Sequence, residues 1–319
     1  MSHCPPSIQA VSDILLQAGS LPGRTVVIPG GDRLDDLRLV ESARDHGMVD
    51  RCILVGSEAG IRAAAEEACV AVPDGDILAT GDAAATAGRT AELVRAGVAD
   101  IILKGNVPTP VLNREMIRLR TRDTVGLVTL FDAAPIAGGR PMLLTDAGVT
   151  TVCDEARLAG LIRNAVDVAR GVLGLPRPRV ALLSANEKVI ESLPSTGLAR
   201  DLSRRDWPEA HVHGPLSFDL AVSPASVRLK GVRLEGAAAE VAGRADVLVC
   251  PGLDAANVLY KVLMEVTRFG LASMAGITVG LPVPYVILSR ADSAETRLLS
   301  IALGSLARER LPDYRSLRS

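Results

Sequence analysis

Residues 245–270 read ADVLVCPGLDAANVLYKVLMEVTRFG, in which a short apolar run meets a Pro-Gly turn and is followed by a segment with helical spacing. The VLVC run is apolar at consecutive positions, which is typical of a strand buried on both faces of a parallel sheet. The same order recurs along the chain, where apolar runs alternate with Ala- and Leu-rich helical stretches; the runs include TVVIPG (25–30), DIILKG (100–105), RVALLSAN (179–186) and PVPYVILSR (282–290). This alternation predicts an α/β fold with mostly parallel sheets.

The size and composition of the chain indicate a globular protein of two domains. It has 319 residues, of which 48% are apolar and 23% charged, and one domain usually holds about 100–150 residues. No run approaches the roughly 18 uninterrupted apolar residues of a membrane helix, and the N-terminus has no basic segment followed by an apolar core. The five cysteines lie far apart without a C-x-x-C pair, as expected of free thiols. We therefore expect a cytoplasmic protein that does not bind a membrane.

The charge balance argues against nucleic acid as a partner. With 35 basic and 37 acidic residues the formal net charge is −2, and aromatic residues make up only 2% of the chain. The protein therefore has no general attraction for a polyanion and few rings on which bases could stack. A small anionic ligand stays compatible with this balance, because it needs only a local cluster of donors.

Polar residues follow several of the predicted strands, at the carboxyl ends where ligands of open parallel sheets bind. These groups are Lys104-Gly105-Asn106, Thr145-Asp146, Ser184 to Lys188, Pro251 to Asn257, and Ser289 to Ser293. A single Ser, Asn or Asp at such a place is most often a helix cap or a turn residue. Arg290 is different, because it follows four consecutive apolar residues and one serine and must reach either solvent or a counter-charge. A phosphate would supply that charge through two parallel hydrogen bonds.

Other chemistries have less support in the sequence. The G-x-S-x-G motif of hydrolases is absent, as are the G-x-G-x-x-G and P-loop signatures of nucleotide-binding enzymes. His211 and His213 could lie on one face of a strand and bind a metal, but no third ligand has a recognisable spacing. The sequence therefore predicts no metal site.

Taken in order, the motifs resemble those of the phosphate acetyltransferase and phosphate butyryltransferase family, and in spelling they are closer to the butyryl branch. The motifs are KGNVPT (104–109), LLTDAGV (143–149), RVALLSANEKV (179–189), GPLSFDLAVSP (214–224), ADVLVCPGLDAANVLYK (245–261) and PYVILSRADS (284–293). The resemblance implies a scaffold like that of isocitrate and isopropylmalate dehydrogenases, with a second α/β domain inserted into the first. The domains implied are 1–135 with 280–319, and 136–279, with the active site in the cleft between them. A homodimer or higher homo-oligomer is also implied.

The resemblance implies an acyltransferase that exchanges a short acyl group, such as acetyl, propionyl or butyryl, between coenzyme A and inorganic phosphate. Coenzyme A would be a substrate, with no tightly bound cofactor and no metal. By the same resemblance Ser289 forms a hydrogen bond at the reacting centre and Arg290 holds the phosphate. The residues expected to contact phosphate or coenzyme A are Lys104, Gly105, Thr109, Asn257, Lys261, Asp292 and Ser293.

One departure from the family pattern leaves the general base unassigned. The acetyl branch has an aspartate seven residues after the serine, and this chain has Thr296 there. Neither Glu295 nor Asp292 occupies the matching position. Two alternatives therefore stay open: a non-catalytic relative that binds coenzyme A or acyl phosphate, and a metal- and NAD-dependent enzyme resembling the dehydrogenases on the same scaffold.

Overall fold

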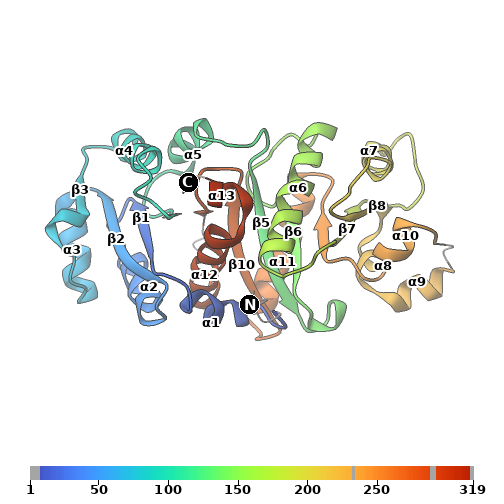
Figure 1. Cartoon of the computed structure of the whole chain (residues 1–319), viewed down its shortest axis with the longest axis horizontal. Helices are drawn as coiled ribbons and strands as arrows, with labels where there is room; N and C mark the ends of the chain where they lie inside the picture. Colours follow the sequence, from blue (N-terminus) through green and yellow to red (C-terminus); the bar gives the residue numbers. More distant parts are fainter. Residues whose placement is uncertain (1–7, 232–233, 288–291, 317–319) are drawn as a thin grey trace. The chain divides into compact units, whose positions relative to one another are not determined.

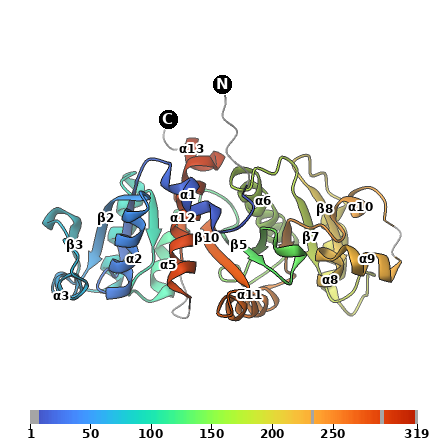
Figure 2. The same ribbon diagram turned by 90° about the horizontal axis from the view of Figure 1, so that it is seen from below.

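The computed structural model describes residues 8–231, 234–287 and 292–316, and the chain divides into two compact units (Figures 1 and 2). The N/C unit comprises Ser12–Arg122 and Gly276–Ser319, and the central unit comprises Met1–Val11 and Asp123–Ala275. Strand β10 (Ala272–Val279) begins in the central unit and ends in the N/C unit. The predicted domain bounds, 1–135 with 280–319 and 136–279, stay a prediction.

The N/C unit is built on a mostly parallel sheet with the strand order β3-β2-β1-β4-β11-β10. The strands besides β10 are β1 (Arg24–Pro29), β2 (Val49–Gly56), β3 (Ile77–Ala79), β4 (Ile101–Leu103) and β11 (Tyr285–Val286). All neighbouring pairs from β3 to β11 run parallel, whereas β10 pairs antiparallel with β11. Consecutive residues of β1 and β4 are buried, as expected of strands covered on both faces.

Helices surround this sheet. They are α1 (Asp13–Gly19), α2 (Leu34–Asp45), α3 (Glu58–Ala68), α4 (Ala83–Arg95), α5 (Thr109–Arg118), α12 (Ala294–Arg310) and α13 (Pro312–Ser316), with a 3-10 turn at Asp74–Asp76. Helix α12 contacts α1 and α2, and α4 contacts α5; in Figure 1, α4 and α5 lie at the upper edge of the unit and α2 at the lower edge. Every residue from Leu299 to Arg308 is buried, so α12 is the central helix of the unit.

The central unit has its own mostly parallel sheet, with the order β5-β6-β9-β7-β8. Its strands are β5 (Gly126–Ala133), β6 (Met142–Thr145), β7 (Arg179–Leu183), β8 (His211–Leu216) and β9 (Val247–Val249). Strands β6, β9, β7 and β8 run parallel, and β5 pairs antiparallel with β6. Both units thus confirm the predicted α/β fold with mostly parallel strands.

The helices of the central unit flank its sheet. They are α6 (Glu155–Gly171), α7 (Pro194–Ser203), α8 (Phe218–Val222), α9 (Pro224–Lys230), α10 (Ala237–Val241) and α11 (Leu253–Thr267), with a 3-10 turn at Ala137–Gly139. Helices α6 and α7 contact each other, as do α8 and α9. One apolar core joins strand residues such as Leu144 and Leu248 to Leu220 of α8 and Leu263 of α11. Within the described residues, no helix is both long and apolar enough to span a bilayer.

Candidate active site

Lys104 lies at the carboxyl end of β4, beside the end of β11. The two strands are parallel, with Leu103 opposite Val286, and the backbone N–H of Lys104 donates to the carbonyl oxygen of Val286 at 3.0 Å. Residues that follow the two strands therefore leave the sheet at the same edge. Lys104 is half-buried, and its Nζ donates to the carbonyl oxygen of Gly105 at 3.2 Å. The predicted phosphate-binding lysine thus neighbours the strand that leads to residues 289 and 290.

The two predicted catalytic residues, Ser289 and Arg290, lie outside the described residues, and their roles stay predictions. The described residues end at 287, just after β11, and begin again at Asp292, which is half-buried. Ser293 follows as the N-cap of α12. The segment that carries Ser289 and Arg290 therefore connects the end of β11 to the start of α12.

Gly105 is required by a close approach of two backbone segments. Its N–H donates to the carbonyl oxygen of Pro29 at 3.1 Å, and the N–H of Asn106 donates to that of Gly30 at 2.7 Å. A Cβ atom on Gly105 would lie 2.4 Å from the oxygen of Gly30, and Gly30 has a φ of +74°. These contacts hold the turns after β1 and β4 together and fix the position of Lys104. Thr109 is half-buried and begins α5, which follows the same turn.

The hydroxyl of Ser293 caps α12. Its Oγ accepts a hydrogen bond from the N–H of Thr296 at 3.1 Å and donates to Thr296 Oγ1 at 3.0 Å. Thr296, seven residues after Ser289, is 6% exposed and is buried in the helix cap. Glu295 is exposed. Through these contacts, Thr296 belongs to the N-terminal cap of α12. The general base stays unassigned.

A buried ion pair, which the motif analysis did not find, joins α12 to α2. Asp36 on α2 is fully buried, and its carboxylate pairs with the guanidinium of Arg297 in α12. Arg33 Nε is 4.0 Å from the same carboxylate. Burial raises the pKa of Asp36, and the two arginines oppose that shift. The ion pair holds the first turn of α12 against α2. The sequence feature that could have indicated it is the acidic first turn of α2.

In the central unit, Asn257 and Lys261 lie one turn apart on α11. The side-chain Nδ2 of Asn257 donates to the carbonyl oxygen of Ala147 at 2.9 Å, which ties α11 to the turn after β6. Lys261 Nζ lies 5.4 Å from the ring centroid of Tyr260. The structure therefore places both predicted contacts on one helix, and their binding to phosphate or coenzyme A stays a prediction.

The turn that receives Asn257 is organised by Asp146. This carboxylate is 3% exposed and accepts hydrogen bonds from four backbone N–H groups, those of Leu127, Gly148, Val149 and Thr150, at 2.7–3.2 Å. Burial raises the pKa of Asp146, whereas the four donors favour its ionised form. The conspicuous TDAG motif is thus explained by the local backbone that Asp146 holds in place.

A second polar cluster lies beyond the carboxyl ends of β7 and β8. Ser217 Oγ is 2.5 Å from Glu187 Oε1 and 2.7 Å from Asp219 Oδ1, and Lys230 Nζ approaches the two carboxylates at 3.1 and 3.2 Å. Hydrogen bonds from Ser217, followed by those from Lys230, lower the pKa of both Glu187 and Asp219. Ser217 and Lys230 thus hold the two carboxylates of this cluster together.

The histidines that were considered as metal ligands lie on β8. His211 and His213 are alternate residues of this strand and are both half-buried, and burial lowers the pKa of His213. In the part of the chain that the structure describes, no group of three or more His, Cys, Asp and Glu is arranged to hold a metal ion.

Comparisons with known proteins agree with these motifs. Residues 79–304 match the model of a family described as phosphate acetyl/butaryl transferase. The phosphate butyryltransferase of Clostridium acetobutylicum is 33% identical to this chain over 308 residues, which cover 94% of this chain and 98% of that protein.

Solved structures agree at the level of the fold. A branched-chain phosphotransacylase from Enterococcus faecalis V583 superposes with a TM-score of 0.75 and 32% identity, covering 90% of this chain and 99% of that one. A 4-hydroxythreonine-4-phosphate dehydrogenase from Burkholderia phymatum, 14% identical with a TM-score of 0.50, shares the fold alone. From the family match and the long curated relative, the chain belongs to the phosphate acetyl/butyryl transferase family.

Proposed function

We propose that this protein exchanges a short acyl group between coenzyme A and inorganic phosphate. A phosphate oxygen attacks the thioester carbonyl, a C–O bond forms, the C–S bond breaks, and the thiolate leaves with the proton that phosphate gives up. The reverse direction forms the thioester from acyl phosphate and the free thiol. Family membership supports this reaction, and coenzyme A enters it as a substrate without a tightly bound cofactor.

The observation that carries the proposal is the position of Lys104 at the end of β4, beside the end of β11. The segment after β11 contains Ser289 and Arg290, so a cation and the predicted phosphate-binding arginine follow adjacent parallel strands. In the proposal, Arg290 and Lys104 neutralise the phosphate, and Ser289 donates a hydrogen bond to the carbonyl oxygen as it gains charge. Thr109, Asp292 and Ser293 lie on the adjoining turns and helix ends.

Helix α11 supports the further proposal that the protein is a homodimer or a higher homo-oligomer. Val258 and Val262 lie one turn apart on α11 and are 65% and 53% exposed, and the nearby Phe269 and Leu271 are 77% and 50% exposed. We call these four residues the α11 apolar patch. Large apolar side chains gathered at one place on a surface commonly mark a protein interface. A second copy of the chain would cover the patch.

The setting we propose is the cytoplasm. Cys52, Cys69, Cys153 and Cys250 are free thiols, and Cys69 is exposed. Unpaired thiols of this kind suit a reducing compartment.

The proposed reaction is tested by following thiol release from acetyl-, propionyl- and butyryl-CoA with and without phosphate. We expect release that depends on phosphate for at least one of the three. Arg290→Ala should raise the phosphate KM at least tenfold, because it removes a counter-charge for the anion. The matched control is Arg268→Ala, which removes an exposed arginine of the central unit and should leave the phosphate KM unchanged. Absence of phosphate-dependent release from all three thioesters would refute the proposed function.

A further inference from the structure

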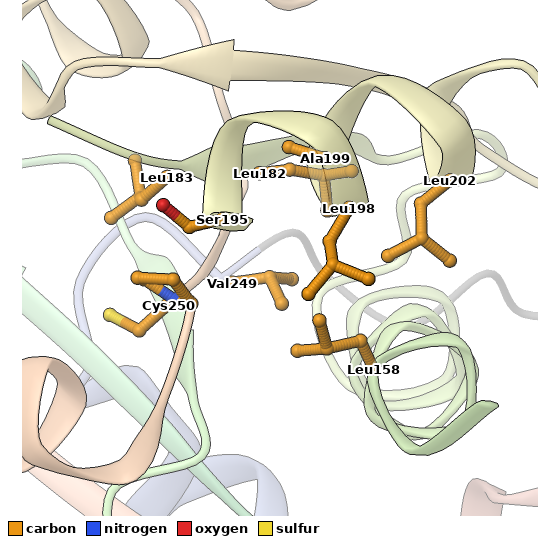
Figure 3. A pocket seen from close by; sticks show the side chains of 10 residues that line it. Leu158, Leu182, Leu183, Ser195, Leu198, Ala199, Leu202, Val249 and Cys250 are labelled. Carbon is orange, nitrogen blue, oxygen red and sulfur yellow. The ribbon is translucent and has the colours of Figure 1, made fainter. Parts of the chain in front are cut away.

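Two cavities of the molecule are too small for a substrate. One lies in the central unit between α6 and α7, where Leu158 and Leu198 point toward each other across it (Figure 3), and its volume is about 10 Å³. The other lies in the N/C unit between α2 and β2, beside Leu37 and Cys52, and has the same volume of about 10 Å³. Such a space holds about one water molecule. The interior around α2 is therefore closely packed, and a charge inside it needs a counter-charge.

That charge and its partner form the buried ion pair between α2 and α12. Asp36 is fully buried, and its Oδ1 accepts a hydrogen bond from the guanidinium of Arg297, whose side chain is 14% exposed. Among the described residues, Asp36 Oδ2 and Arg297 Nε have no hydrogen-bond partner. A buried ion pair often adds little stability compared with apolar side chains of the same size, but it can fix one relative position of two elements. Positioning therefore explains this pair better than stability does.

On one side of the pair, α2 is connected to the turn that carries Lys104. Helix α2 follows the turn after β1, where the carbonyl oxygen of Gly30 accepts the N–H of Asn106 at 2.7 Å. The backbone N–H of Lys104 in turn donates to the carbonyl oxygen of Val286 in β11 at 3.0 Å. The contacts between these turns and strands thus hold the start of α2 and Lys104 in one arrangement.

On the other side, Arg297 is bonded to the predicted phosphate contacts at the start of α12. The backbone N–H of Arg297 donates to the carbonyl oxygen of Ser293 at 3.1 Å, and the hydroxyl of Ser293 caps the helix at the N–H of Thr296. Asp292 directly precedes Ser293. A shift of Arg297 would therefore move both Asp292 and Ser293 relative to Lys104.

On the basis of the proposed function, we propose that Asp36 and Arg297 are positioning residues of the phosphate site. The ion pair holds Asp292 and Ser293 in place relative to Lys104. It therefore sets the affinity for phosphate without touching the anion.

A second buried pair, at the other end of α12, provides a matched control. Arg24 of β1 is 1% exposed, its guanidinium is 2.8 Å from Glu309 Oε2, and its Nε donates to Ser305 Oγ at 3.2 Å. Glu309 lies about 18 Å beyond Arg297 along the helix. This pair holds the same helix in the same unit, but it lies far from Ser293.

The test compares the double variants Asp36→Asn/Arg297→Met and Arg24→Met/Glu309→Gln, each of which removes both charges of one pair. Thiol release gives the KM for phosphate and for the acyl-CoA that the wild type prefers, and circular dichroism shows that each variant is folded. We expect the phosphate KM to rise roughly tenfold in the first double variant alone, because misplacing a binding group by about 1 Å can cost about 100-fold. The KM for acyl-CoA should stay unchanged. Arg297→Lys keeps the charge and should recover most of the affinity for phosphate.

An unchanged phosphate KM in Asp36→Asn/Arg297→Met would overturn the positioning role. An equal rise in both double variants would overturn it as well, because a loosened α12 would explain that result. If the first double variant does not fold, the phosphate KM of Arg297→Met against that of Arg297→Lys decides, and equal values overturn the proposal.

Calorimetry with inorganic phosphate separates this inference from the proposed reaction. If the wild type releases no thiol from any acyl-CoA, the proposed function fails, and the dissociation constants for phosphate are compared across the same variants. Binding that weakens in Asp36→Asn/Arg297→Met and not in Arg24→Met/Glu309→Gln supports the positioning role. A wild type that neither releases thiol nor binds phosphate would overturn both proposals.

Discussion

At the scale of single residues, the structure shows which polar side chains at strand ends hold the neighbouring backbone in place. Asp146 belongs to the first kind, since its carboxylate accepts four backbone N–H groups. The sequence marked it as a polar residue at a strand end but could not reveal its partners, because Leu127 comes from a different strand. Lys104 lies beside β11, and its contact with a ligand stays a prediction. Ser289 and Arg290 rest on the motif alone.

Replacing Asp146 should destabilise the protein strongly. In Asp146→Ala the buried N–H of Leu127 loses its acceptor, and we expect the free energy of unfolding to fall by roughly 2–4 kcal/mol. The control is Asp154→Ala, because Asp154 is an exposed cap of α6 whose carboxylate accepts the backbone N–H of Arg157 at 2.8 Å and pairs with its guanidinium at 3.6 Å. That loss should cost about 1 kcal/mol. Urea unfolding monitored by circular dichroism measures both, and equal losses would contradict the role given to Asp146.

His213 should make stability depend on pH below neutrality. Burial lowers its pKa from 6.5, so the unfolded chain binds a proton more readily than the folded protein. The stability that neutral His213 contributes is fully present above pH 6.5, the pKa in the unfolded chain. It is lost as the pH falls through the lower pKa of the folded protein. The slope is at most about 1.4 kcal/mol per pH unit. His213→Gln should flatten the curve of unfolding free energy between pH 7 and pH 5, and parallel curves for the two proteins would exclude this role.

At the scale of elements, the alternation of strands and helices was predictable and the pairing of strands was not. Strand β4 lies beside β11, although about 180 residues separate them, and only the folded chain shows that Lys104 neighbours this segment. In the described part of this apolar run, residues 282–287, the strand is Tyr285–Val286, and Pro284 before it has no N–H to donate. Helices α8, α9 and α10 span five to seven residues, which is too short for a clear helical period.

The start of α12 allows a test of whether Ser293 is a helix cap, a ligand contact or both. Ser293→Ala removes the acceptor for the N–H of Thr296 and should lower the free energy of unfolding by about 1 kcal/mol. Ser293→Asp keeps a capping oxygen and should restore most of that stability. If Ser293 also binds phosphate, the added negative charge should raise the phosphate KM in Ser293→Asp alone. If the phosphate KM is unchanged in both variants, Ser293 is a helix cap only and does not belong to the predicted phosphate site.

At the scale of the whole molecule, composition predicted a globular protein, and the ordered motifs predicted its family. Whether copies of the chain associate through an exposed surface is harder to predict from the sequence. Val258 and Val262 of the α11 apolar patch have the same helical spacing as core residues, and their exposure in the structure distinguishes them from the buried Leu263.

The α11 apolar patch should control the oligomeric state. Val262→Glu combined with Phe269→Glu places two charges on the patch, and burying unpaired charges in an interface is costly. We expect light scattering coupled to size exclusion to give the mass of an oligomer for the wild type and that of a 33.3 kDa monomer for the double variant. Leu229→Glu, at another exposed leucine, should keep the wild-type mass. A monomeric wild type, or a double variant with unchanged mass, would show that the patch does not join copies of this chain.

The division of the N/C unit into two segments has a consequence for biosynthesis. The central unit is complete once residue 275 has been made, whereas the N/C unit still lacks β11 and α12, which pair with β4 and pack on α1 and α2. Because chains emerge from the ribosome N-terminus first and domains generally fold as units, we expect the central unit to fold before the N/C unit is complete. The segment with Ser289 and Arg290 is among the last to be translated, so a chain cut short after β10 would lack it even if the central unit had folded.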